Sequence, residues 1–111
     1  MKKLLVYAHY YYPDVASMGQ ILTELCESLV DKFDVTVICT VSSYSGKIEN
    51  KYKNKKYYFE EINGVHVVRV SVPEFNKSNK LSRIKNIYVY YKKAIKVTNK
   101  LGKFDLVYAL S

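Results

Sequence analysis

The residues best suited to chemistry lie in a polar and aromatic segment near the amino terminus, residues 9–20 (HYYYPDVASMGQ). An apolar stretch precedes this segment and a helical periodicity of apolar residues follows it, which predicts a loop between a strand and a helix. In an open α/β sheet, ligands bind at the carboxyl ends of the strands, where such loops lie. The loop is therefore the strongest candidate for a ligand site.

Two features of this loop define the start of the helix. Pro13 fixes its own φ and keeps Tyr12 out of the helical region. Ser17 and Gln20 have the spacing of a capping box, which places the beginning of the helix at Ser17. Gly19 then lies in the first helical turn, where unpaired N–H groups suit a phosphate or a sugar oxyanion. The missing side chain at Gly19 allows either a ligand or a neighbouring strand to approach closely, and both interpretations stay open.

Alternating strand and helix patterns extend along the whole chain. Strands are predicted over residues 3–9, 34–41, 57–62, 65–72 and 104–110, and helices over residues 18–32 and 79–101. Strand–helix–strand units give parallel strands with right-handed crossovers, and Asn63-Gly64 predicts a two-residue hairpin turn. The predicted fold class is α/β: a Rossmann-like parallel sheet with helices on both faces and a β-hairpin at one edge.

The expected strand order identifies one crevice. Starting from the hairpin edge, the strands follow in the order 57–62, 65–72, 34–41, 3–9 and 104–110. Chain order reverses between the last two strands, and ligands in open α/β sheets bind at such a reversal. The loop that follows residue 9 is therefore expected to meet Ser111 there.

The polar segment 42–56 follows the strand 34–41 and is predicted to be an exposed loop. Ser42 and Tyr44, at its start, are expected to lie near a substrate, whereas the part beyond Gly46 is interpreted as a connector.

Three other reactive residues are given structural roles. His66 lies in a hairpin strand, where a lone histidine is more often exposed or hydrogen-bonded within the fold than a general base. Cys26 and Cys39 lack a metal-binding spacing. Both occupy apolar positions, so we expect reduced core thiols in a cytoplasmic protein. No metal site is expected.

The predicted helix 79–101 is amphipathic and basic. Its apolar positions keep three- and four-residue spacing: Leu81, Ile84, Ile87, Tyr88, Tyr91, Ile95, Thr98 and Leu101. The positions between them are mostly basic: Lys80, Arg83, Lys85, Lys92, Lys93, Lys96 and Lys100. We expect the apolar face to pack against the sheet. The alternative is contact with an anionic membrane, although no segment is long enough to span a bilayer.

The chain of 111 residues has a formal net charge of +8 and contains twelve tyrosines. Such charge is compatible with nucleic acid, anionic membranes or acidic substrates. Most of the excess lysines lie in residues 47–56 and 77–103 and are interpreted as solvated surface. The alternative function is a basic nucleic-acid-binding module with tyrosines that stack on bases, although no such motif is recognised. A nucleotide- or flavin-binding domain is less favoured, because the loop lacks closely spaced glycines.

Seven short motifs, in order, resemble the amino terminus of bacterial family-4 (group 1) glycosyltransferases of the GT-B fold. Within that family, the chain is similar to enzymes that build exopolysaccharides such as colanic acid. The motifs that carry the resemblance are KLLVY (3–7), HYYYPD (9–14), SMGQ (17–20), LTEL (22–25), FDVTVIC (33–39), NGVHVVRV (63–70) and KFDLVYA (103–109).

The resemblance implies a retaining glycosyltransferase that moves a sugar from a nucleotide-sugar donor to a glycan or lipid-linked acceptor in cell-surface polysaccharide synthesis. It implies that residues 1–111 are part of the amino-terminal, acceptor-side domain, that the carboxyl-terminal sugar-nucleotide domain is absent, and that this fragment alone is inactive. The nucleotide-sugar is a substrate, so no cofactor and no metal are expected. The expected location is the cytoplasm, with peripheral contact at the inner face of the cell membrane.

The resemblance also implies roles for residues of the first loop. Gly19 and Gln20 would face the donor diphosphate. The acceptor side would be lined by Tyr11, Tyr12, Pro13 and Ser17, to which the second loop adds Ser42 and Tyr44. His9 and Asp14 are the titratable groups of the first loop, and neither is assigned a catalytic role. The family's paired glutamates and basic diphosphate clamp belong to the absent domain, so the catalytic residues are unknown.

Overall fold

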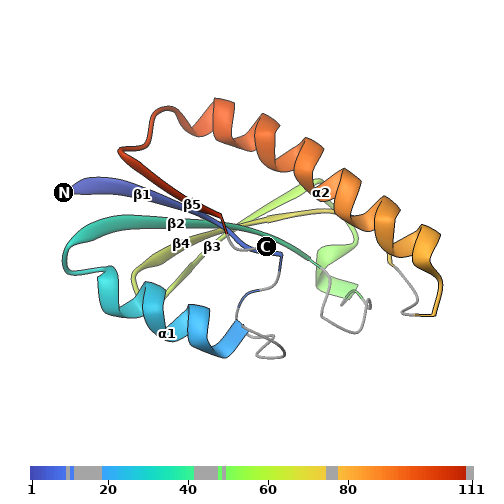
Figure 1. Ribbon diagram of the computed structural model, residues 1–111, viewed down its shortest axis with the longest axis horizontal. Helices are drawn as coiled ribbons and strands as arrows, with labels where there is room; N and C mark the ends of the chain where they lie inside the picture. The colour runs from blue at the N-terminus through green and yellow to red at the C-terminus, as the bar shows by residue number, and fades with distance from the viewer. Residues whose placement is uncertain (10, 12–18, 42–47, 49, 75–77, 110–111) are drawn as a thin grey trace.

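The computed structural model describes residues 1–9, 11, 19–41, 48, 50–74 and 78–109. Within these residues, the chain forms an α/β fold with a five-stranded mixed sheet and two α-helices (Figure 1). The strands are β1 (Lys2–Tyr7), β2 (Phe33–Thr40), β3 (Tyr57–Ile62), β4 (Val65–Val70) and β5 (Leu106–Ala109). The helices are α1 (Gly19–Leu29) and α2 (Lys80–Leu101), and a short 3-10 helix covers Asn50–Tyr52.

The strand order is β3-β4-β2-β1-β5. The strands β1, β2, β4 and β5 are parallel, whereas β3 pairs with β4 in the antiparallel direction. The predicted order of the strands, including the hairpin at one edge, is therefore confirmed. Chain order reverses between β1 and β5, which lie side by side in the sheet (Figure 1).

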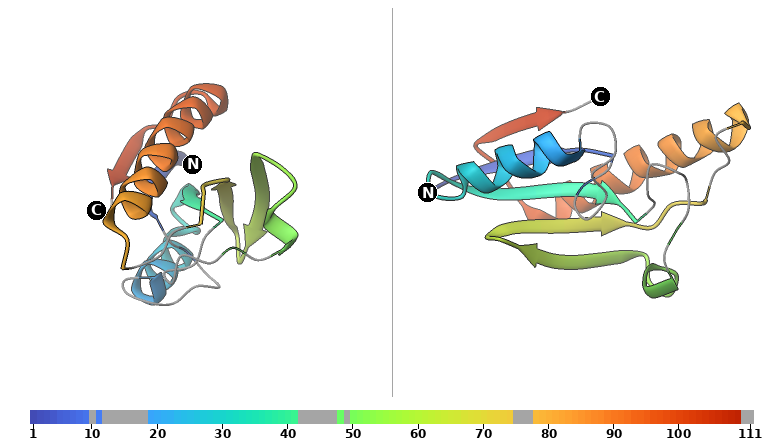
Figure 2. Two further views of the ribbon diagram at one scale, coloured as in Figure 1. Left: turned by 90° about the vertical axis from the view of Figure 1, so that its right-hand side faces the viewer. Right: turned by 90° about the horizontal axis from the view of Figure 1, so that it is seen from below.

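The two helices cover opposite faces of the sheet, as predicted (Figures 1 and 2). Successive side chains of a strand point to opposite faces. Leu4 and Val6 of β1 accordingly belong to one hydrophobic cluster with Leu22 of α1, whereas Leu5 belongs to a second cluster with Ala94 of α2. Burial on both faces explains the apolar character of β1, β2 and β4, whereas the four residues of β5 are exposed.

Turn residues set the ends of several elements. Asn63 and Gly64 have φ angles of 50° and 86°, which confirms the predicted hairpin turn, since two-residue turns of this kind need positive φ at both positions. Gly102 ends α2 with a φ of 99°, as predicted. The Asn79 side chain caps the start of α2 by accepting a hydrogen bond from the Leu81 N–H at 3.0 Å.

Helix α1 is shorter than the predicted helix 18–32. The N–H of Lys32 donates to the carbonyl of Leu29 at 3.0 Å, and this turn leads directly into β2.

The prediction that the bulky apolar face of α2 packs against the sheet is wrong. The buried side chains of α2 are Asn86, Tyr90, Ala94 and Val97. The bulky apolar residues face solvent instead, with exposed fractions of 78% for Leu81, 61% for Ile84, 64% for Tyr88, 55% for Tyr91 and 61% for Ile95.

The fit between the helix and the sheet explains the difference. Ala94 and Val97 are small, so the backbone of α2 can approach the sheet closely. Asn86 and Tyr90 carry polar atoms that pair with backbone groups at the strand ends, which apolar side chains cannot do. The prediction from the sequence used only the spacing of apolar residues. It therefore assigned the wrong face of α2 to the sheet.

Candidate functional site at the carboxyl ends of the strands

Tyr90 of α2 joins the carboxyl ends of β1 and β2. Its buried hydroxyl lies 2.7 Å from the carbonyl oxygen of Ile38 and 3.1 Å from that of Ala8, so one donor is shared by the two strands. Thr40 adds another link, because its N–H and its hydroxyl each lie 3.0 Å from the carbonyl oxygen of His9. These bonds fix the chain where the candidate loop begins.

Asn86, one turn before Tyr90 on α2, is fully buried. Its Nδ2 donates to the carbonyl of Pro73 at 2.7 Å, and its Oδ1 lies 2.7 Å from Nε2 of His9. Because the amide nitrogen is engaged by Pro73, the amide oxygen must accept, and Nε2 of His9 carries the hydrogen. Through two polar side chains, α2 therefore ties together the carboxyl ends of β1, β2 and the segment after β4.

The surroundings of the His9 imidazole disfavour its charged form. Its ring contacts the Tyr90 ring edge-on, with 5.0 Å between the centroids. Burial lowers the pKa of His9; the hydrogen bond with Asn86 opposes this effect, and the charge of Arg83 lowers the pKa further. The exposed Arg83 guanidinium thus lies near enough to act on the ring. The charge of Arg83 therefore reaches the end of β1, where it favours the binding of an anion.

We predict that the chain loses stability as the pH falls below 6.5, the ordinary pKa of histidine. The pKa of His9 is lower in the folded chain than in the unfolded chain, so the unfolded state takes up the proton first and acid favours unfolding. Above this range the contribution of His9 is fully present. Urea unfolding from about pH 8 to about pH 5 should show a steeper loss in the wild type than in His9→Gln, whose side-chain amide can still donate to Asn86. Equal slopes, or a His9 ring signal that titrates above 6.5 in NMR spectra, would contradict the assignment.

The structure places few of the residues proposed from the sequence. Gly19 and Gln20 lie in the first turn of α1, as predicted. The structure describes only the backbone of these two residues. Apart from Tyr11, the other proposed site residues lie outside the described residues: Tyr12, Pro13, Ser17, Ser42 and Tyr44. Asp14 and Ser111 also lie outside them.

Tyr11, expected on the acceptor side, is the one residue of that group whose position the structure describes. It is 1% exposed and belongs to the core cluster that includes Leu22 and Cys26 of α1. Burial, followed by the neighbouring Cys26 thiol, raises the pKa of its hydroxyl. That hydroxyl has no hydrogen-bond partner among the described residues. In the described residues Tyr11 therefore packs in the core beside α1.

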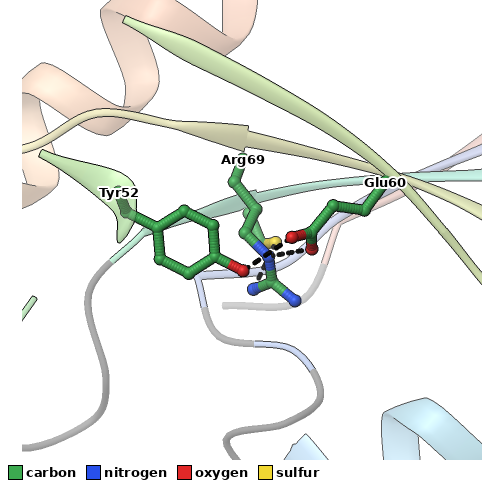
Figure 3. A network of polar contacts seen from close by, with 4 residues as sticks. Tyr52, Glu60 and Arg69 are labelled. Carbon is green, nitrogen blue, oxygen red and sulfur yellow. Dashed lines mark hydrogen bonds and ion pairs between the residues drawn. The ribbon is translucent and has the colours of Figure 1, made fainter. Parts of the chain in front are cut away.

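A second polar network lies at the hairpin, and its groups neutralise one another (Figure 3). The Arg69 side chain is 4% exposed, and its Nε donates to Oε1 of Glu60 at 2.7 Å. The Tyr52 hydroxyl donates to the other carboxylate oxygen at 2.7 Å. This network attaches the segment 50–56 to the hairpin. Tyr52 is 6% exposed and belongs to the core, so the prediction of an exposed loop is wrong at this residue.

The residues given structural roles from the sequence have such roles. His66 is half-exposed, and its Nε2 lies 3.1 Å from a carboxylate oxygen of Asp34 on the adjacent strand. Cys26 and Cys39 are buried and free of disulfide bonds. Burial raises the pKa of Cys26 to about 11 and that of Cys39 to about 12, so both are unreactive thiols at neutral pH.

Three residues of the site, Arg83, Asn86 and Tyr90, were assigned no functional role from the sequence. A signal for Asn86 exists: it keeps helical spacing with Tyr90, Ala94 and Val97, and a polar residue in such a row has to find hydrogen-bond partners. No sequence feature distinguishes Arg83 from the lysines around it. Arg83 was identified only through its electrostatic effect on His9 in the folded chain.

Among the described residues, no three or more histidine, cysteine or acidic side chains are grouped closely enough to hold a metal ion. In the same part of the chain, neither helix combines the length and apolar character needed to cross a membrane. Comparisons with protein-family models, with curated proteins and with solved structures gave no match.

Proposed function

We propose that this chain is part of the acceptor-side domain of a retaining glycosyltransferase of the GT-B type. In this proposal the whole enzyme moves a sugar from a nucleotide-sugar to a glycan or lipid-linked acceptor of cell-surface polysaccharide synthesis. The domain is Rossmann-like, and the sugar-nucleotide domain lies outside residues 1–111. The chain by itself binds ligand without turnover.

The observation that best supports the proposal is the position of β1 together with the groups near its carboxyl end. The strand lies where chain order reverses, which is where open α/β sheets bind their ligands. His9 lies just beyond its carboxyl end, and the charge of Arg83 acts on the His9 ring. The loop that leaves this end leads to Gly19 at the first turn of α1, whose N–H groups favour anions.

Each part then has a task in binding. Arg83 supplies positive charge to the acceptor diphosphate and the first turn of α1 supplies it to the donor diphosphate, while Asn86 keeps the end of β1 in place through His9. Retaining transfer of this kind depends on positioning the acceptor and stabilising the leaving diphosphate. Gly19 and Gln20 face the donor diphosphate. The acceptor side is lined by Tyr11, Tyr12, Pro13 and Ser17, together with Ser42 and Tyr44.

Calorimetric titration with two diphosphate ligands tests the proposal: a polyprenyl diphosphate-sugar as acceptor and a uridine diphosphate-sugar as donor. We expect the acceptor to bind more tightly, because the nucleoside pocket belongs to the other domain. Arg83→Gln should weaken acceptor binding about tenfold, the typical effect of losing a charge-assisted contact. Lys85→Gln, which removes an exposed charge two residues away on another side of α2, is the matched control.

Two results would overturn the proposal. The first is an absence of acceptor binding, or an equal loss of affinity in Arg83→Gln and Lys85→Gln. The second is tight binding of single-stranded nucleic acid that weakens steeply with salt, which would favour the alternative of a nucleic-acid-binding module.

A further inference from the structure

A pocket of about 560 Å³ opens at the carboxyl end of β4. One wall is the segment that follows β4, and the other is the segment 52–56, which leads into β3. Figure 2 shows the short 3-10 helix at this end of the hairpin, away from its turn. Strand β2 separates β4 from β1 in the sheet, so the pocket is distinct from the candidate site at β1. Its volume lies within the range of about 300–1,000 Å³ that is typical of small-molecule sites.

The pocket combines an apolar floor with a cationic rim. Tyr52 and Val72 line it and are only 6% and 7% exposed, because they belong to the core. Three exposed lysines surround this floor: Lys53, Lys55 and Lys56. Among the described residues that line the pocket, the one acidic side chain is Glu74, whose carboxylate accepts a hydrogen bond from the Ile48 N–H at 2.9 Å. Positive charge therefore prevails at the opening.

Hydrogen bonds within the chain fix the backbone that carries these lysines. The Tyr58 hydroxyl oxygen accepts from the N–H groups of Asn54 and Lys55, at 2.9 Å and 2.8 Å. The carbonyl oxygen of Lys56 accepts from the Ser71 N–H at 2.8 Å, which joins the two walls. The lysines of the rim thus differ from charges spread over a solvated surface, because their backbone is positioned relative to the pocket.

A fourth cation lies behind the wall that follows β4. Nζ of Lys93 on α2 donates to the carbonyl oxygen of Ser71 at 2.7 Å and also to the Ser71 hydroxyl oxygen. Because this oxygen accepts from Lys93, the hydroxyl hydrogen of Ser71 points away from the ammonium group. Burial lowers the pKa of Lys93, and the charge of Lys56 lowers it further. Two ammonium groups therefore repel each other here, and a bound anion would offset that repulsion.

We propose that this pocket binds a small organic phosphate monoester. Such a group carries a charge of about −1.5 to −2 at pH 7, and lysines bind phosphate as point charges. The lysine rim and the Ser71 hydroxyl contact the phosphate, while Tyr52 and Val72 face the carbon skeleton. The proposal does not depend on the transferase function proposed above, because it uses no residue of the site at β1.

Amide chemical-shift mapping of the whole chain during titration with glucose 6-phosphate, in phosphate-free buffer, tests this proposal. We expect the largest saturable shifts at Lys55, Lys56 and Ser71 rather than at His9 or Gly19. Glucose 6-phosphate should bind more tightly than inorganic phosphate, because the apolar floor adds contacts, and glucose alone should not bind. Lys55→Gln combined with Lys56→Gln should weaken the binding of glucose 6-phosphate by at least about tenfold.

Two further variants separate a built pocket from diffuse attraction to lysines. Lys92→Gln combined with Lys96→Gln removes the same charge from exposed positions of α2, and this matched control should bind as the wild type does. Ser71→Ala leaves the net charge unchanged and should weaken binding roughly fivefold through one lost hydrogen bond. Circular dichroism should confirm that every variant is folded.

The proposal is overturned if glucose 6-phosphate does not bind, or if inorganic phosphate binds as tightly. It is also overturned if the two double variants lose equal affinity, or if Ser71→Ala binds as the wild type does. Largest shifts at His9 and Gly19 would place the phosphate at β1 instead. None of these results would remove the proposed function, which concerns the site at β1.

Discussion

Asn86→Leu lowers the free energy of unfolding by about 3 kcal/mol, since a buried polar group left without its partner costs about 1–3 kcal/mol. Two groups lose their partner in this variant: the Nε2–H of His9 and the carbonyl oxygen of Pro73. Leucine has a similar volume, so the effect reports the lost hydrogen bonds rather than a cavity. Urea unfolding followed by circular dichroism measures the change.

Asn99→Leu is the control for this result, because Asn99 is an exposed asparagine of the same helix. A substitution at such a surface position should change stability by less than about 0.5 kcal/mol. The hydrogen bond with Asn86 raises the pKa of His9, so Asn86→Leu should also move the titration of the His9 ring to lower pH. Equal stability of the two variants would show that the Asn86 bridge does not hold the strand ends together.

The second large effect concerns the buried cation of the hairpin. Glu60→Leu removes the carboxylate that Arg69 contacts at 2.7 Å. Taking away one partner of a buried ion pair typically costs about 3–5 kcal/mol, and we expect the lower end because Glu60 itself is 30% exposed. Arg69→Met should cost less, because the remaining carboxylate can be hydrated whereas the guanidinium cannot.

Urea unfolding should show a larger loss of stability for Glu60→Leu than for Arg69→Met. The opposite order would contradict this explanation. Acid titration gives a second readout. Burial alone would raise the pKa of Glu60, but hydrogen bonds from Arg69 and Tyr52 outweigh it, and the pKa lies below its ordinary value of 4.5. The stability supplied by this pair is therefore present above that value and is lost as the pH falls through the lower folded pKa.

Local sequence signals were sufficient to predict the sheet. The apolar runs marked the parallel strands, and Asn63-Gly64 fixed the register of the hairpin. With Ile62 opposite Val65, Glu60 lies opposite Val67, which puts its side chain on the same face of the sheet as Arg69. The ion pair could thus have been predicted once the turn was known.

The face that α2 buries could not be predicted from hydrophobicity, because both sides of this helix carry apolar residues. The choice depends on how closely the helix approaches the sheet and on which strand-end carbonyls need a donor. Both are properties of the assembled fold, so Asn86, Tyr90 and Arg83 became identifiable as site residues only in three dimensions. The position of Gly19 in the first turn of α1, in contrast, followed from the local capping pattern.

The central claim is that ligand binds at the carboxyl end of β1, beside β5 and the start of α1. Amide chemical-shift mapping of the whole chain during titration with a uridine diphosphate-sugar tests it most directly. We expect the largest shifts at His9, Gly19 and Ala109, with smaller ones along the inner side of α2. Shifts confined to residues 50–56, or spread evenly over the lysines of α2, would contradict it.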